Sequence, residues 1–166
     1  MILYEKIFDS EFCDYLVKYV KKNCQLSYVT YKINWPLWNL WGSSFMPKYE
    51  KEFYDENIKK EIFDRLRPNF NIDDYRLIWL QMTEYAEGTS PLVDHLDGKN
   101  NKTFIIVLTD NFIGGETYID NKKIELSKGD GIFFDGYKIY HGVRGVKFGV
   151  RNALNIWLKP NLNKLI

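Results

Sequence analysis

The chain of 166 residues has the length of one domain, and its 45% hydrophobic and 17% aromatic content excludes disorder and allows a sizeable core. Its 23 basic and 22 acidic residues leave a net charge of +1, which excludes the strongly basic surface of a duplex nucleic-acid-binding protein. The sequence contains no apolar run of membrane-spanning length and no signal-peptide pattern at its N-terminus. We therefore expect a soluble, intracellular (cytoplasmic) protein with no membrane partner.

The N-terminal region, residues 1–74, is predicted to support a core that the rest of the chain forms. Asp9 or Ser10 is expected to begin a helix, because apolar residues then recur at helical spacing. Residues 26–33 are β-branched, aromatic and roughly alternating, which favours a strand. Asp55 is the expected N-cap of a second helix.

Between these segments lies an aromatic stretch that contains Trp35, Trp38 and Trp41, three of the five tryptophans. Pro36 and Gly42 favour a loop or hairpin for it. Two interpretations are open. The rings can seal one end of the core, as buried tryptophans commonly do. Alternatively, they can border a substrate entrance as a lid, which is the hypothesis to be tested.

Cys13 and Cys24 are the only cysteines. Both are predicted to lie on one helix, eleven residues apart, which is too far for a disulfide. We expect free thiols in the core, as in a reducing compartment.

From Tyr75 onward the pattern has a period of two, which is typical of strands. Apolar segments separated by Gly, Asn and Asp turns predict further strands at 103–108, 117–119, 123–126, 131–134, 139–143 and 150–158. Residues 111–116 are predicted to be a turn. Helices followed by short strands indicate a mainly β (α+β) protein, a double-stranded β-helix or jelly roll with helices packed on one sheet. We expect one domain over 1–166, with 75–158 as its jelly-roll core.

The only two histidines, His95 and His141, are candidate metal ligands. Asp97 follows His95 by two residues, after a predicted strand and a Gly-Pro loop. His141 comes 46 residues after His95. In a jelly roll these segments belong to one barrel, so the three side chains can converge. Two imidazoles and a carboxylate with open coordination positions form the facial triad of non-haem Fe(II) oxygenases.

Arg151 is a second candidate site residue, on the predicted last strand. An arginine that faces the interior of an apolar strand is costly unless an anion pairs with it. The partner is either a bound ligand or a carboxylate of the protein, for which Asp135 and Glu116 are the candidates.

The order of motifs in the C-terminal half is more specific than any one of them. The motifs are Tyr85-x-x-Gly88, His95-x-Asp97, Gly114-Gly115-Glu116-Thr117-Tyr118, Lys128-Gly129-Asp130, Phe133-Phe134, His141-Gly142-Val143 and Gly149-x-Arg151-x-x-Leu154-x-x-Trp157. In this order they resemble the catalytic core of the Fe(II)- and 2-oxoglutarate-dependent dioxygenases, and specifically the prolyl 4-hydroxylase-like branch. The resemblance covers about half of the chain; residues 1–74 resemble the family only in outline.

The resemblance implies a set of cofactors and contacts. Fe(II) would be bound by His95, Asp97 and His141, with 2-oxoglutarate and O2 as cosubstrates and ascorbate as a stimulant. Arg151 would pair with the far carboxylate of 2-oxoglutarate. The further residues expected at the cosubstrate are Tyr85, Thr103, Val107, Asn155 and Trp157.

The function that follows is hydroxylation of an unactivated C–H bond with conversion of 2-oxoglutarate to succinate. By resemblance the leading substrate is a prolyl residue or a related amino acid or peptide, and the partner is a peptide, protein or small molecule. One alternative is an oxidative demethylase of nucleic-acid bases, which would use the same triad; the near-neutral charge and the lack of a second arginine on the last strand argue against it. The other alternative is a non-enzymatic jelly-roll module that binds metal.

Overall fold

The computed structural model describes residues 1–29, 35–43, 52–99 and 101–161. The helices are α1 (Ser10–Asn23), α2 (Glu56–Leu66) and the short 3-10 helix η1 (Ile72–Asp74). The described strands are β1 (Ile2–Tyr4), β2 (Gln25–Val29), β3 (Trp35–Ser43), β4 (Glu52–Tyr54), β5 (Tyr75–Ala86), β6 (Leu92–His95), β7 (Lys102–Val107), β8 (Phe112–Gly114), β9 (Thr117–Ile119), β10 (Lys122–Ile124), β11 (Gly131–Phe134), β12 (His141–Val143) and β13 (Val146–Pro160).

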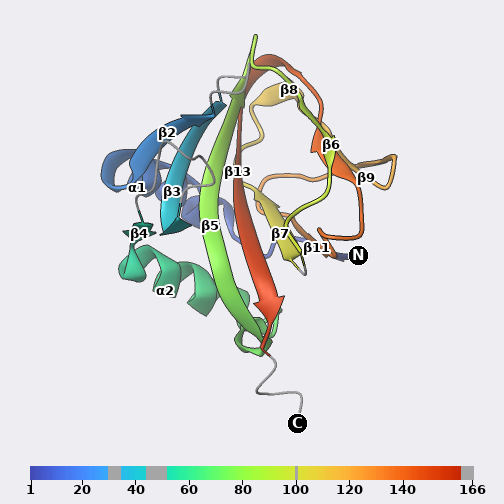
Figure 1. Cartoon of the computed structure of the whole chain (residues 1–166). Coiled ribbons are helices and arrows are strands. Elements are labelled where there is room, and N and C mark those ends of the chain that lie inside the picture. The colour runs from blue at the N-terminus through green and yellow to red at the C-terminus, as the bar shows by residue number, and fades with distance from the viewer. Residues whose placement is uncertain (30–34, 44–51, 100, 162–166) are drawn as a thin grey trace.

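Two antiparallel sheets form the body of the protein (Figure 1). In the described residues, the larger sheet has nine strands in the order β1-β11-β7-β13-β5-β3-β2, with β4 paired to β3 and β8 paired to β13. The smaller sheet has four strands in the order β10-β9-β12-β6. The long strands β5 and β13 run side by side through the centre of the larger sheet and are the axis from which the site is built (Figure 1).

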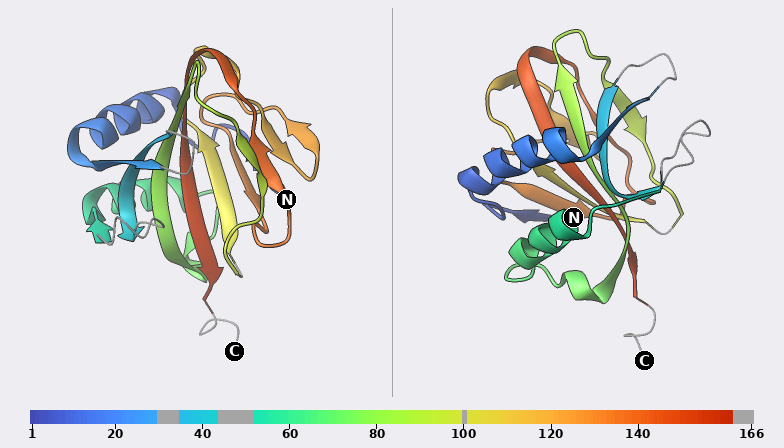
Figure 2. Two further views of the ribbon diagram at one scale, coloured as in Figure 1. Left: turned by 45° about the horizontal axis from the view of Figure 1, so that its top comes forward. Right: turned by 90° about the vertical axis from the view of Figure 1, so that its left-hand side faces the viewer.

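Helices α1 and α2 cover the face of the larger sheet that is turned away from the smaller one (Figure 2). The side chain of Asp9 caps α1 by accepting a hydrogen bond of 2.7 Å from the amide of Phe12. Asp55 caps α2 in the same way through the amide of Ile58, at 3.1 Å. The Asp55 cap was predicted, and the prediction for α1 left Asp9 and Ser10 as alternatives. A carboxylate caps a helix because it satisfies amides that have no partner within the helix.

The alternation of side chains along β5 separates the two faces of the larger sheet. Leu80 and Met82 point toward the helices and join the main core. Gln81, Thr83 and Tyr85 point toward the smaller sheet, where they border a cavity. Because side chains alternate with a period of two, one strand supplies both the core and the site.

Three predicted loops contain strands. The segment between β5 and Asp97 includes β6, the predicted 111–116 turn includes β8, and the tryptophan stretch forms β3. β6 and β8 have four and three residues, so their hydrophobic pattern is too short to be recognised, and pairing with β12 and β13 creates them. Pro36 is tolerated in β3 because, among the described residues, β3 pairs with β5 only from Leu37 onward.

Part of the predicted 26–33 strand is present as β2, and residues 30–33 lie outside the described residues. The last strand, β13, begins at Val146 and ends at Pro160, so it is longer than the predicted 150–158. Its N-terminal part pairs with β8, which the sequence pattern did not reveal.

Candidate metal centre and cavity

His95, Asp97 and His141 meet on the smaller sheet. His95 is the last residue of β6 and His141 is the first of β12, and the two residues are directly paired in the register of these strands. Their ring centroids lie 4.4 Å apart. The Asp97 carboxylate reaches both rings, with Oδ1 3.7 Å from His95 Nε2 and Oδ2 3.4 Å from His141 Nε2. One ligand atom from each residue lies within 4.8 Å of the others, so the three can surround one metal ion.

Both imidazoles present the same nitrogen to this point. His95 Nδ1 lies 3.0 Å from the carbonyl oxygen of Val93, and His141 Nδ1 lies 3.0 Å from that of Ile139. A carbonyl oxygen only accepts hydrogen bonds, so each Nδ1 carries a proton and donates it. When a ring is neutral, its Nε2 therefore has a lone pair available for a metal, an orientation typical of metal-binding histidines.

The negative charge of the Asp97 carboxylate is stabilised by the groups around it. Burial alone would raise the pKa of this carboxyl, but the two imidazoles and the Thr103 hydroxyl hold it below its ordinary value. Thr103 Oγ1 donates to Asp97 Oδ2, and the Asp97 amide donates to the carbonyl of Gly136 at 2.8 Å. Burial likewise would lower the pKa of His95, but Asp97 and the Val93 carbonyl outweigh it and raise that pKa. The carboxylate is thus ionised and oriented as a ligand.

Two glycines allow this close assembly. A Cβ on Gly136 would collide with Thr103 Oγ1 and Asp97 Oδ2. A Cβ on Gly142, which follows His141, would collide with the Asp94 carboxylate and lie 2.6 Å from the Leu92 carbonyl oxygen. Glycine is needed at both positions because the neighbouring side-chain and backbone atoms leave no room for a Cβ.

A cavity of about 320 Å³ opens beside the three ligands. The predicted site residues that line it are Tyr85, His95, Asp97, Thr103, His141, Arg151, Asn155 and Trp157. Of the residues expected at the cosubstrate, Val107 alone does not line the cavity, although it is buried. The structure thus brings together side chains from β5, β6, β7, β12 and β13 around one space.

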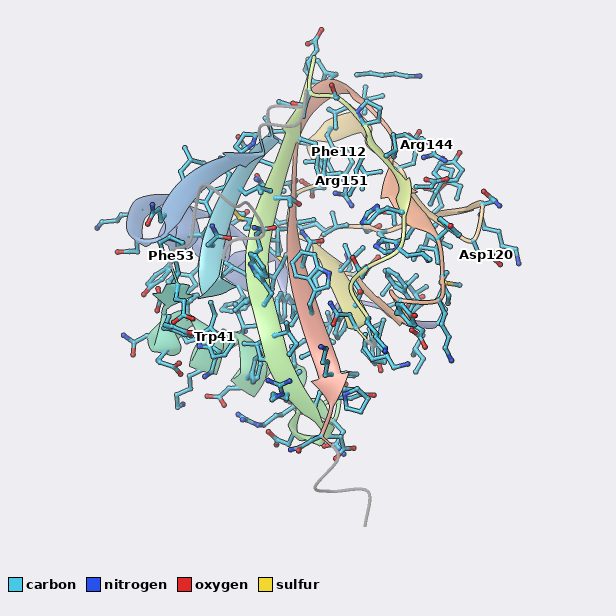
Figure 3. All side chains as sticks on the ribbon, viewed as in Figure 1. Trp41, Phe53, Phe112, Asp120, Arg144 and Arg151 are labelled. Carbon is cyan, nitrogen blue, oxygen red and sulfur yellow. The ribbon has the colours of Figure 1, made fainter. Side chains whose placement is uncertain are left out.

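Arg151 is the most deeply buried charged residue of this cavity, with 1% of its surface exposed. Its side chain extends from β13 toward β9 (Figure 3), where Nη2 donates to Thr117 Oγ1 at 2.9 Å. The guanidinium carbon lies 5.6 Å from the centre of the Tyr85 ring. Burial lowers the pKa of Arg151 and raises the pKa of Tyr85. Such a position is unfavourable for a cation that lacks a counter-ion.

No carboxylate of the described residues forms an ion pair with Arg151. Asp135, one of the two candidates, pairs instead with Lys102 at 2.6 Å. Glu116, the other, makes no ion pair with Arg151 either. Within the described residues, the guanidinium is in contact with the Thr117 hydroxyl and lies near the Tyr85 ring, and neither neutralises its charge.

The tryptophan hypothesis is wrong for the side chains that the structure describes. Trp38 is 7% exposed and packs into the core between the larger sheet and the helices. Trp41 packs against the same core, on the helix side, and its Nε1 donates to Glu56 of α2 at 2.7 Å (Figure 3). The side chain of Trp35 lies outside the described residues. In β3 it is Leu37, on the opposite face, that reaches the cavity.

Several contributors to the site were not predicted. Thr117 belongs to the quoted Gly-Gly-Glu-Thr-Tyr motif, so its position carried a signal that we did not use. The close approach of Gly136 to Thr103 and Asp97 joins segments that lie far apart in the chain, and the bond from Thr103 to Asp97, six residues away, depends on how the intervening loop folds; no sequence pattern reveals either.

Neither protein-family models nor curated proteins match this sequence. Solved structures do. A viral collagen prolyl hydroxylase from Paramecium Bursaria Chlorella virus-1, solved as its 2OG complex, has a TM-score of 0.66 and 21% identity over 96% of both chains. An oxidoreductase of the 2OG-Fe(II) oxygenase family from Burkholderia pseudomallei has a TM-score of 0.73 and 17% identity, covering 95% of this chain and 84% of that one. HygX from Streptomyces hygroscopicus, with nickel and 2-oxoglutarate bound, has a TM-score of 0.66 and 11% identity, covering 97% of this chain and 83% of that one.

The chain has the fold of the 2OG-Fe(II) oxygenases. The predicted jelly roll with helices on one sheet is thereby confirmed. It is also the fold that the resemblance to this family implied. The described helices include none with the length and apolarity needed to span a bilayer.

Proposed function

We propose that this protein is an Fe(II)- and 2-oxoglutarate-dependent dioxygenase that hydroxylates an unactivated C–H bond. One observation carries the proposal: a set of two imidazoles and one carboxylate shares a cavity with a buried guanidinium that, among the described residues, has no carboxylate partner. The first group suits a metal, and the second suits an anion. A cosubstrate that is both a chelator and a carboxylate satisfies both.

The donor set fits Fe(II). Imidazole nitrogen and carboxylate oxygen are the ligand types of the 2-His-1-carboxylate triad, which leaves the remaining positions open. Donor atoms on one octahedral face, each at about 2.1 Å from the ion, are about 3 Å apart. The separations of 3.4 and 3.7 Å between Asp97 and the two rings need only a small contraction. A closed structural site would commonly have four protein ligands, and the described cluster has three.

Arg151 would hold the far carboxylate of 2-oxoglutarate. Its planar fork can bind both oxygens, which a lysine cannot do. Thr117 fixes the guanidinium from the other side, so its orientation is set before the ligand arrives. Tyr85, Thr103, Asn155 and Trp157 would complete the walls and exclude water.

Fe(II), held by His95, Asp97 and His141, would supply the oxidation in which one atom of O2 enters succinate as 2-oxoglutarate loses CO2 and the other enters the substrate C–H bond. The protein would orient the metal ligands through the hydrogen bonds from the two imidazoles to backbone carbonyls and from Thr103 to Asp97. It would also shield the cavity from solvent. We further propose that the substrate is a prolyl residue or a related amino acid or peptide. The fold likeness to a collagen prolyl hydroxylase supports this, although HygX, with hygromycin B bound, has the same fold.

The test is a turnover screen with Fe(II), O2 and 2-oxoglutarate that measures succinate, with and without peptides, amino acids and oligonucleotides. We expect succinate formation that a peptide or amino acid stimulates. Asp97→Ala should abolish it, whereas Asp64→Ala, which removes an exposed carboxylate of α2, should not.

Three results would overturn the proposal. Absence of succinate in every condition, together with metal binding, would favour the binding module. Stimulation by methylated oligonucleotides alone would favour the demethylase. Equal turnover in Asp97→Ala would remove the metal centre from the reaction.

A further inference from the structure

Three amide side chains form a row across the inner face of the larger sheet. Asn39 on β3 lies opposite Gln81 on β5, and Gln81 lies opposite Asn155 on β13. Residues that are directly opposite on neighbouring strands share a face and contact one another. The row therefore extends from the cosubstrate end of the cavity across two further strands.

The side chains of this row are held in place by burial and by hydrogen bonds. Asn39 is 2% exposed and Gln81 is 6% exposed, and Gln81 Nε2 donates to Asn39 Oδ1 at 2.8 Å. Asn155 Nδ2 donates to Thr83 Oγ1 at 3.1 Å. Placing amides in a protein interior is unfavourable unless their hydrogen bonds are made.

The amides of Gln81 and Asn155 retain hydrogen-bonding capacity. Each side chain has two N–H donors and a carbonyl oxygen. Within the part of the chain that the structure describes, the bonds above use one donor of each. Both side chains line the cavity, whereas Asn39 does not and serves to orient Gln81.

Among the residues that the structure describes, the rest of the cavity wall is uncharged. The ionisable acids and bases of this described lining, besides the weakly acidic Tyr85, are the three candidate metal ligands and Arg151, which the proposed function assigns to Fe(II) and 2-oxoglutarate. The aliphatic side chains of the described lining are Leu37, Leu92, Leu96, Ile105 and Val143. A charged group that enters here would lose its hydration without gaining a counter-ion.

We propose that Gln81, oriented by Asn39, binds a backbone amide of a peptide substrate, so that the reacting residue lies within a chain and is not a free amino acid. This inference rests on the proposed function. A peptide group offers one N–H and one carbonyl oxygen, which match the donor and acceptor of a carboxamide. A free amino acid brings an ammonium and a carboxylate, and the neutral wall pairs with neither.

The experiment uses the full chain loaded with Zn(II) and 2-oxoglutarate, which binds without turnover. Isothermal titration first measures 2-oxoglutarate, then twenty tripeptides acetyl-Gly-X-Gly-amide and the twenty corresponding free amino acids X. We expect at least one blocked tripeptide to bind at least about tenfold more tightly than its free amino acid, since each unmatched buried charge or polar group lowers affinity by about this factor or more.

The double variant Asn39→Leu/Gln81→Met replaces both members of the hydrogen bond with apolar side chains of similar size, so neither amide is left without the other, and the variant should fold. We expect the dissociation constant of the best tripeptide to rise about tenfold while that of 2-oxoglutarate is unchanged. The matched control is Asn152→Leu, on the helix-facing side of β13, where the amide donates to Glu84. It should leave tripeptide binding unchanged.

The inference is overturned if free amino acids bind as tightly as the blocked tripeptides, if no tripeptide binds, or if the double variant binds the best tripeptide as the wild type does. The comparison of tripeptides with free amino acids uses the wild type alone, so it tests the inference even if the double variant misfolds. A wild type that fails to bind 2-oxoglutarate rejects the proposed function itself. Normal 2-oxoglutarate binding with a negative tripeptide panel rejects the peptide inference alone.

Discussion

Arg151 is the single residue that best separates an enzyme from a binding module. Arg151→Ala should weaken 2-oxoglutarate binding by about 2–5 kcal/mol, and Arg151→Lys should lose part of this, because a buried charge pair is broken in the first and reduced to one contact in the second. Titration of 2-oxoglutarate against each variant loaded with Mn(II) measures the effect. Metal binding should persist, since the guanidinium is not a ligand.

Arg65, an exposed arginine of α2 that pairs with Asp9, provides the control. Arg65→Ala should leave 2-oxoglutarate affinity unchanged. If Arg151→Ala also leaves it unchanged and lowers thermal stability instead, Arg151 is a structural residue and the main support for a 2-oxoglutarate enzyme is lost.

The two cysteines should be unreactive in the folded protein. Burial raises the pKa of Cys13 to about 11, and burial together with the Asp55 carboxylate raises the pKa of Cys24 to about 12. The thiolate is the reactive form, so at pH 8 we expect iodoacetamide to modify neither residue until the protein is denatured. Mass spectrometry before and after denaturation measures this. Rapid labelling of the native protein would contradict it.

The same shifts have a consequence for stability. Unfolded thiols ionise near pH 8.5, whereas the folded ones remain protonated. Above this pH the unfolded state binds fewer protons than the folded state, so the free energy of unfolding should fall as pH rises.

At the scale of the element, β3 joins two parts of the protein through its two faces. Trp38 faces the helices, where Lys21 lies 5.3 Å from its ring, and Leu37 faces the cavity. Trp38→Ala should lower the free energy of unfolding by about 3–5 kcal/mol, because it opens a cavity in the main core. Urea denaturation monitored by circular dichroism measures this.

Trp38→Phe is the companion variant, which keeps a ring in the core and should be markedly less destabilising. Binding of 2-oxoglutarate by the fraction that remains folded should be unchanged in both. A stable Trp38→Ala protein with impaired substrate binding would restore the lid interpretation.

At the scale of the whole molecule, the proposed metal would connect segments that are distant in sequence. Its candidate ligands come from β6, the loop that follows it, and β12. A metal that binds the folded state only should stabilise it by about 2.7 kcal/mol at one hundred times the dissociation constant. For a chain of this size that corresponds to about 5–10 °C in Tm.

Differential scanning calorimetry with and without excess Mn(II) measures this shift. His141→Ala should abolish most of it, because one of the three ligands is removed. A shift of the same size in His141→Ala would place the metal elsewhere.

What the sequence determined by itself is the local part of this structure. Residue type and spacing indicated the starts of both helices, the period of two along β5 and the candidate site residues His95, Asp97, His141 and Arg151. The helix starts and the period of two depend on neighbours within a few positions, whereas the candidate site residues were recognised from the order of motifs along the chain. The fold class followed from their order.

The tertiary structure alone decided which side chains face which space. Trp38 entered the core and Leu37 the cavity because pairing with β5 set the register of β3, and a shift of one residue would exchange the two faces. The glycine at 136 and the amide row depend on contacts between segments that are distant in the sequence. Such contacts leave no local pattern, because each side chain is selected by a partner that only folding brings near.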